Sequence, residues 1–172
     1  IQPPISIMRR FQLLHRCFTR SCALPQSRDA SAVISSSVFA YADGASRGNP
    51  GRSGCGALLV DPSTGSVLAT ETKYVGDLET NNAAEYHGLM LALQLAQQHQ
   101  ATHVHIHMDS QLIVRQMQGQ YRVKAANLRT LHQQCKELSA AFPHVTFSHV
   151  AREENTEADR LANEAIDEYD GR

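Results

Sequence analysis

Long apolar runs are missing from this sequence, and its cysteines lack the spacing of a metal or redox motif. No uninterrupted stretch approaches the roughly 18 apolar residues that a helix needs to cross a bilayer, so we expect no membrane partner. The four cysteines form neither a C-x-x-C pair nor a zinc spacing, which predicts reduced thiols. With 172 residues, 42% of them hydrophobic, the chain is long enough for one globular domain with a sizeable core.

A strong excess of positive charge is also missing. The formal net charge is −1, and five arginines and one acid lie within residues 1–37, which leaves 11 basic and 16 acidic residues, a net of −5, after position 37. Domains that bind nucleic acid are usually basic. Composition therefore argues mildly against such a partner, and any such assignment has to come from the site.

Residues 1–37 are predicted to lie outside the folded domain, which we place at 38–172. The segment is rich in arginine and poor in acids, and three apolar residues follow one another at helical spacing: Phe11, Leu14 and Phe18. This pattern is typical of a mitochondrial targeting segment. The alternative is a disordered basic arm that touches nucleic acid, in a protein of the nucleus or cytoplasm. A fluorescent fusion of residues 8–37 that stays cytosolic would contradict mitochondrial import.

From Val38 onward the pattern becomes regular. Apolar runs between turn signals predict strands over 38–43, 54–60, 66–75, 103–108 and 145–150. Helical periodicity predicts helices over 81–99, 111–117, 126–141 and 155–169. The first three strands most simply form an antiparallel meander, and the later strands alternate with helices. We therefore predict an α/β fold in which helices flank a five-stranded mixed sheet, three strands antiparallel and two parallel.

Histidines alternate with apolar residues over 103–108, at His103, His105 and His107. A half-buried strand has this alternation, so the pattern favours a structural role over a histidine metal site.

Four acids stand in four separate motifs: Asp43, Glu85, Asp109 and Asp159. Asp43 and Asp109 each close a predicted strand, whereas Glu85 and Asp159 are expected in the first turns of helices. Each acid alone has an ordinary explanation in a turn or at a helix N-terminus. Four carboxylates that face one another cost several kcal/mol unless they are protonated or neutralised by a cation. Carboxylate oxygens select Mg²⁺ or Mn²⁺, and two such ions about 4 Å apart promote phosphodiester cleavage.

The blocks that carry these acids resemble the four signature blocks of type 1 ribonuclease H, in the order and at the spacing of that family. They are DGASRGNPG at 43–51, TNNAAE at 80–85, DSQ at 109–111 and NTEAD at 155–159. The resemblance covers nearly all of 38–169. It implies a ribonuclease H-like fold and a magnesium-dependent enzyme that cleaves the RNA strand of an RNA–DNA hybrid duplex. By the same resemblance, Asp43, Glu85, Asp109 and Asp159 would be the catalytic residues and would hold two Mg²⁺ ions. We expect a monomer.

The resemblance also implies substrate-binding residues. Asn49, Asn81, Asn82 and Gln111 match positions that contact 2′-hydroxyls and base edges in the minor groove, and Thr80 matches a position that seats a phosphate of the DNA strand. The alternative for Thr80 and Asn81 is a role in capping the helix that follows.

His149 lies at the spacing where the family often has a mobile histidine that helps product or metal leave. Alternation with Val145 and Phe147 allows a half-buried structural histidine instead. The loop 150–154 lacks the glycine and second histidine of many bacterial members, so the chain is more similar to the archaeal and retroelement-related branch.

The stretch 119–125 is too short for the basic protrusion that grips the hybrid in many relatives, and it leaves Arg122, Lys124 and Arg129 as scattered charges. We therefore expect weak, salt-sensitive hybrid binding. Two alternatives stay open: a relaxed nuclease that also cuts double-stranded RNA, and a non-catalytic hybrid-binding module derived from a retroelement.

Overall fold

The computed structural model describes residues 36–171. The predicted targeting segment therefore falls almost wholly outside the described residues. The elements in chain order are β1 (Ser37–Gly48), β2 (Gly51–Val60), β3 (Val67–Glu79), α1 (Asn81–Gln98), β4 (His103–Met108), α2 (Gln111–Met117), α3 (Ala126–Ala140), β5 (His144–His149), a 3-10 turn (Arg152–Glu154) and α4 (Thr156–Asp170). None of the described helices is long and apolar enough to cross a membrane.

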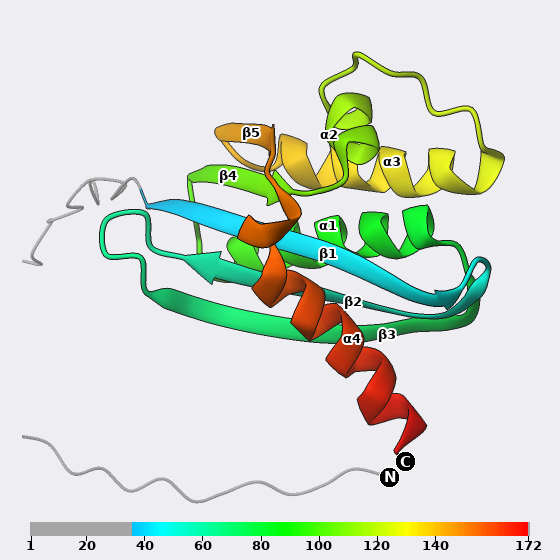
Figure 1. Ribbon diagram of the computed structural model, residues 1–172. Coiled ribbons are helices and arrows are strands. Elements are labelled where there is room, and N and C mark those ends of the chain that lie inside the picture. Colours follow the sequence, from blue (N-terminus) through cyan, green and yellow to red (C-terminus); the bar gives the residue numbers. More distant parts are fainter. Residues whose placement is uncertain (1–35, 172) are drawn as a thin grey trace, which may run out of the picture. The chain divides into compact units, whose positions relative to one another are not determined.

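The five strands form one sheet in the order β3-β2-β1-β4-β5 (Figure 1). Strands β1, β2 and β3 are antiparallel neighbours, whereas β4 runs parallel to both β1 and β5. The mixed sheet predicted from the sequence is confirmed. Because β1 and β4 are parallel neighbours, their carboxyl ends lie at the same edge of the sheet.

Helices α1 and α4 cover opposite faces of the sheet, as Figure 1 shows. A Cβ added at Gly56 of β2 would lie 2.4 Å from the Cβ of Leu161 in α4, so this side of β2 touches α4. A Cβ added at Gly44 of β1 would lie 2.1 Å from the carbonyl carbon of Ala84 in α1. Gly44 pairs with Cys55, which precedes Gly56 in β2. Paired residues share a face and successive strand residues face opposite sides, so Gly44 faces α1 on one side of the sheet and Gly56 faces α4 on the other.

The core lies between the sheet and α1, and it extends to α2 and α3. The stripe predicted for α1 is fully buried, at Leu89, Ala92, Leu93 and Ala96. On β4 the histidines are half-buried and their apolar neighbours buried, as the alternation predicts.

The prediction that the first strand ends at Asp43 is wrong. Strand β1 continues to Gly48, and residues 44–48 pair with 51–55 of β2 in a hairpin whose tip is Asn49 and Pro50. Residues 44–48 are small or polar and look like a turn in the sequence, but cross-strand pairing holds them extended. Strand β3 likewise runs beyond its predicted end, to Glu79.

Candidate active site

Four carboxylates, three from β1, α1 and α4 and one from the residue after β4, line one pocket of about 260 Å³. Parallel pairing sets Tyr41 of β1 beside His107 of β4, and the same register continued by two residues brings Asp43 beside Asp109. Glu85 reaches the pocket from α1 and Asp159 from α4. The structure therefore brings together all four acids that the sequence singles out.

The prediction that Glu85 lies in the first turn of its helix is wrong. Helix α1 begins at Asn81 with Thr80 as its N-cap, so Glu85 is the fifth helical residue and its first turn contains no acid. The N-terminal dipole therefore gives a weak explanation for this carboxylate. Asp159 does lie in the first turn of α4.

Two of the carboxyl groups have strongly raised pKa values. Asp43 is 6% exposed, and burial followed by the charge of Asp109 raises its pKa to about 8, although the Gly44 N–H donates to its Oδ1 at 2.8 Å. Burial also raises the pKa of Glu85 to about 7, with a smaller contribution from Asp109. Carboxylates that lie close together and are partly shielded from water repel one another when ionised, and a bound cation would offset this repulsion.

Polar neighbours fix how these carboxylates are oriented. Ser110 Oγ donates to Glu85 Oε2 at 2.7 Å, and Asn81 Nδ2 donates to Glu85 Oε1 at 3.1 Å. The Arg152 guanidinium lies 3.4 Å from Asp159 Oδ1. Sequence reasoning missed Ser110 and Arg152. The only signal for Ser110 is that it lies inside the DSQ block.

The donor set fits a hard divalent cation, because all four groups are carboxylates and carboxylate oxygens are the ligands that Mg²⁺ and Mn²⁺ prefer. Over residues 36–171, however, no three His, Cys, Asp or Glu side chains converge closely enough to hold a metal ion as they stand. The side chains would have to close around a cation when it binds.

Comparison with known proteins identifies the family. The model of the family described as reverse transcriptase-like matches residues 41–165. The N-terminal ribonuclease H domain of Rv2228c from Mycobacterium tuberculosis is 43% identical, with a TM-score of 0.74 over 77% of this chain and 95% of that one. The chain belongs to the type 1 ribonuclease H family. The resemblance drawn from the four blocks is confirmed.

Two further type 1 ribonucleases H have similar structures. Ribonuclease H1 of Halobacterium salinarum is 39% identical, with a TM-score of 0.74 over 77% of this chain and 98% of that one. LC11-RNase H1, solved in complex with an RNA/DNA hybrid, is also 39% identical, with a TM-score of 0.72 over 77% and 98% of the two chains. Over 130 residues, this chain is 44% identical to the bifunctional protein Rv2228c of Mycobacterium tuberculosis. The matched residues make up only 35% of the length of that protein.

The candidate substrate-binding residues of this ribonuclease H domain lie near the pocket but differ in their contacts. Thr80 Oγ1 accepts the Ala83 N–H at 3.3 Å, so the capping role is confirmed. Asn49 Oδ1 accepts the backbone N–H of Asn81 at 3.3 Å, which ties the β1–β2 hairpin to the start of α1. Gln111 is exposed at the start of α2. The roles of these residues in binding nucleic acid stay predictions.

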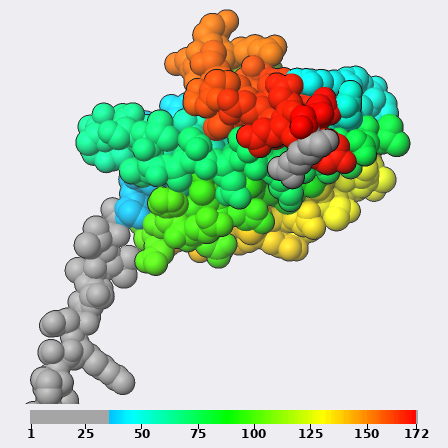
Figure 2. Space-filling view, turned by 90° about the horizontal axis from the view of Figure 1, so that it is seen from below, coloured from blue at the N-terminus to red at the C-terminus, as the bar shows by residue number. Residues whose placement is uncertain are grey.

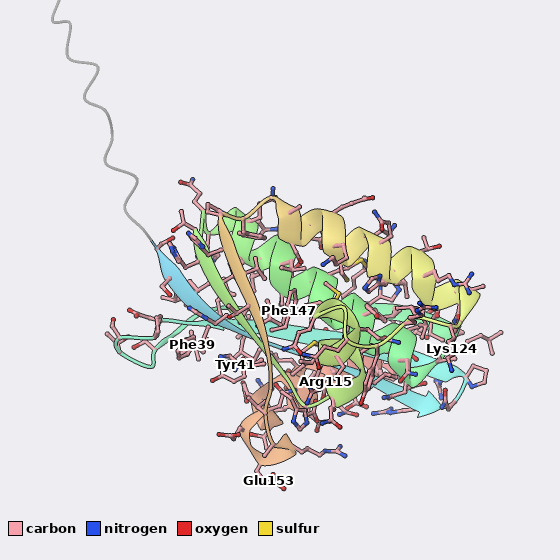
Figure 3. The ribbon with its side chains drawn as sticks, turned by 90° about the horizontal axis from the view of Figure 1, so that it is seen from above. Phe39, Tyr41, Arg115, Lys124, Phe147 and Glu153 are labelled. Carbon is pink, nitrogen blue, oxygen red and sulfur yellow. The ribbon has the colours of Figure 1, made fainter. Side chains whose placement is uncertain are left out.

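Asn82 lines a second, larger pocket of about 580 Å³, with walls from α2, α3 and the connection between them. Two exposed apolar side chains, Leu112 and Tyr121, and two cations, Arg122 and Lys124, line it as well. Figure 3 labels Lys124 in this connection.

His149 is exposed at the end of β5, so the half-buried alternative is wrong. Its Nε2 lies 3.2 Å from the backbone oxygen of Asp109. The residue is outside the lining of the carboxylate pocket, and its part in catalysis stays a prediction.

In EDTA, the free energy of unfolding is expected to fall as pH rises from about 4 to about 8. When the pKa of a carboxyl group is higher in the folded state than in the unfolded chain, there is a pH range in which the group is protonated in the folded protein and ionised in the unfolded chain. For Asp43 this window runs from 3.8 to about 8, and for Glu85 from 4.5 to about 7. The folded state binds more protons there, so a few kcal/mol are lost as pH rises through the window.

Thermal unfolding at each pH checks this expectation, with Asp43→Asn as the control because an amide does not titrate. The slope of Tm against pH should be smaller in the variant, and Mg²⁺ should raise the wild-type Tm most at high pH. Identical slopes for the two proteins would contradict the raised pKa of Asp43.

Proposed function

We propose that the chain is a magnesium-dependent endoribonuclease that hydrolyses the RNA strand of RNA–DNA hybrids. The observation that carries the proposal is the pocket that all four block carboxylates line, with two of them at raised pKa. Membership of the type 1 ribonuclease H family supports it. The hybrid bound to LC11-RNase H1 supports the choice of substrate.

Asp43, Glu85, Asp109 and Asp159 would hold the two Mg²⁺ ions, or Mn²⁺ in their place. When bound, such a pair lowers the pKa of a water molecule and stabilises charge on the leaving oxygen. The chain itself supplies orientation. Ser110 and Asn81 restrain both oxygens of Glu85, and this fixed geometry reduces the reorganisation that the reaction needs.

Asn49 and Asn81 are expected to contact the RNA strand, because Asn81 lines the carboxylate pocket and Asn49 Oδ1 accepts its backbone N–H. Amides both donate and accept hydrogen bonds, which suits the 2′-hydroxyl that distinguishes RNA from DNA. Asn82, which follows Asn81 on α1, lines the larger pocket together with Arg122 and Lys124, and these two cations would contact phosphates. The hybrid would thus lie across α1 and the α2–α3 connection.

Cleavage of three labelled duplexes tests the choice of substrate. The full chain with Mg²⁺ should cut the RNA of an RNA–DNA hybrid and leave a DNA–DNA duplex intact. Cutting of RNA–RNA at a comparable rate would favour the relaxed nuclease, the alternative that the short α2–α3 connection suggests. Hybrid binding without any cutting would favour the non-catalytic module.

Hybrid affinity is expected to fall steeply with salt. Among residues 36–171, several cations already have partners. Arg129 donates to the backbone oxygens of Val123 and Lys124. Two hairpin arginines pair with the end of α4, as Arg47–Asp167, Arg47–Asp170 and Arg52–Asp170. Figure 2 shows α4, in red, against the β1–β2 hairpin, in cyan. About three phosphate contacts predict a roughly 40-fold loss of affinity between 50 and 200 mM salt.

Fluorescence anisotropy over a salt series measures this slope. Lys124→Ala should reduce its magnitude by about 1, whereas Lys136→Ala, at an exposed site of α3 outside both pockets, should leave it unchanged. Tight binding that persists at several hundred millimolar salt would contradict the expectation.

A further inference from the structure

Asn155 occupies the N-cap position of α4, yet its side chain makes no capping hydrogen bond. An asparagine at this position ordinarily accepts a backbone N–H of the first turn. Here the side chain is turned the other way and is only 1% exposed. Its Nδ2 donates to the backbone oxygen of Ala42 at 3.1 Å and to Asp109 Oδ1 at 3.0 Å.

The chemistry of the two partners fixes the orientation of this amide. A backbone carbonyl and an ionised carboxylate only accept hydrogen bonds, so a flipped amide would set oxygen against oxygen at both contacts. This orientation has a cost at Oδ1, which is buried and accepts no hydrogen bond from any group of residues 36–171. A residue selected only for stability would be expected to cap the helix and leave no acceptor unpaired.

The two hydrogen bonds connect three segments that carry catalytic candidates. Ala42 is the β1 residue next to Asp43, and Asp109 follows β4 directly. Asn155 itself precedes the turn of α4 that carries Asp159, and its backbone oxygen accepts the Asp159 N–H at 3.1 Å. From the start of α4, one side chain thus contacts β1 beside Asp43 and the residue that follows β4.

We propose that Asn155 is a positioning residue, which holds the Asp109 carboxylate and the β1 backbone beside Asp43 in the arrangement that binds the divalent cation. The inference rests on the proposed function and names a residue that acts through Asp109 rather than on the substrate. Side chains that orient metal-binding carboxylates typically contribute about 10- to 100-fold in metal affinity or activity.

Two variants of the full chain test the inference, Asn155→Ala and Asn155→Asp. Both remove the amide donors, and the second keeps the size of the side chain. We expect kcat on a hybrid to fall about 10- to 100-fold in both, with KM within about threefold of wild type. The Mg²⁺ affinity, measured by calorimetry without nucleic acid, should fall by a similar factor.

Leu161→Ala is the matched control, because Leu161 is a buried residue of α4 that packs on β2 rather than on the carboxylates. It should lower Tm and leave kcat and Mg²⁺ affinity unchanged at temperatures where the protein is folded. Wild-type kcat and Mg²⁺ affinity in folded Asn155→Ala would overturn the inference, and so would a loss confined to Asn155→Asp, which would reflect the added charge. If the wild type cuts no hybrid, the proposed function fails, and the Mg²⁺ titration alone decides the role of Asn155.

Discussion

Asp109→Asn is expected to reduce hybrid cleavage by about 10³-fold or more, which corresponds to about 4 kcal/mol of transition-state stabilisation. Asp109 lines the pocket with the other three acids, and its charge contributes to the raised pKa of both Asp43 and Glu85. Asparagine keeps the size of the side chain but removes the negative charge that a divalent cation needs. Single-turnover cleavage of a labelled hybrid measures the loss.

The same substitution should not unfold the protein. Removing one charge lowers the pKa of the two neighbouring carboxyl groups toward their usual values, so Tm in EDTA should rise or stay constant at pH 8. Hybrid affinity should stay within about threefold of wild type. Glu168→Gln, at an exposed site of α4, is the control for a carboxylate outside the pocket and should retain full activity. Substantial cleavage by Asp109→Asn would remove the basis for the carboxylate mechanism.

Gly44→Ala is expected to destabilise the protein by about 3 kcal/mol or more and to abolish activity. A Cβ at Gly44 would lie 2.1 Å from the carbonyl carbon of Ala84 and 2.2 Å from the backbone nitrogen of Glu85. These are backbone atoms of α1 and cannot turn aside as a flexible side chain can. Strand β1 and helix α1 would have to separate, which moves Asp43 away from Glu85.

Gly76→Ala is the matched control in the same sheet. A Cβ there would meet only the Glu79 side chain, with its nearest atom 3.5 Å away, and Gly76 is not among the glycines with a positive φ. Urea denaturation of the two variants should show a large loss for Gly44→Ala and a small change for Gly76→Ala. Equal stabilities would mean that α1 does not pack on β1 as closely as the structure has it.

Sequence patterns predicted the parts of the fold that local chemistry determines. Strand β4 and helix α2 have the bounds that alternation and helical periodicity indicate. The four blocks located all four pocket carboxylates, although Asp43 lies within β1 rather than at its end and Glu85 lies beyond the first turn of α1. The extension of β1 past Asp43 was missed because residues 44–48 are extended only through pairing with β2, which a local pattern does not record.

Sequence patterns also did not predict contacts between residues that are far apart in the sequence. Asn155 and Ala42 are 113 positions apart, and the sequence gives Asn155 an ordinary place at the start of a helix. Only the packing of α4 on the sheet brings its amide to the carboxylate site. The larger pocket is likewise assembled from α1 and the α2–α3 connection, whose approach depends on how the helices pack.

The decisive measurement is product analysis of a hybrid with labelled RNA, cut by the full chain with Mg²⁺, with Mn²⁺ or with EDTA. We expect cuts within the RNA strand that need a divalent cation and leave a 3′-hydroxyl and a 5′-phosphate. Folded protein that binds the hybrid but cuts with neither ion, or that cuts equally well in EDTA, would contradict it.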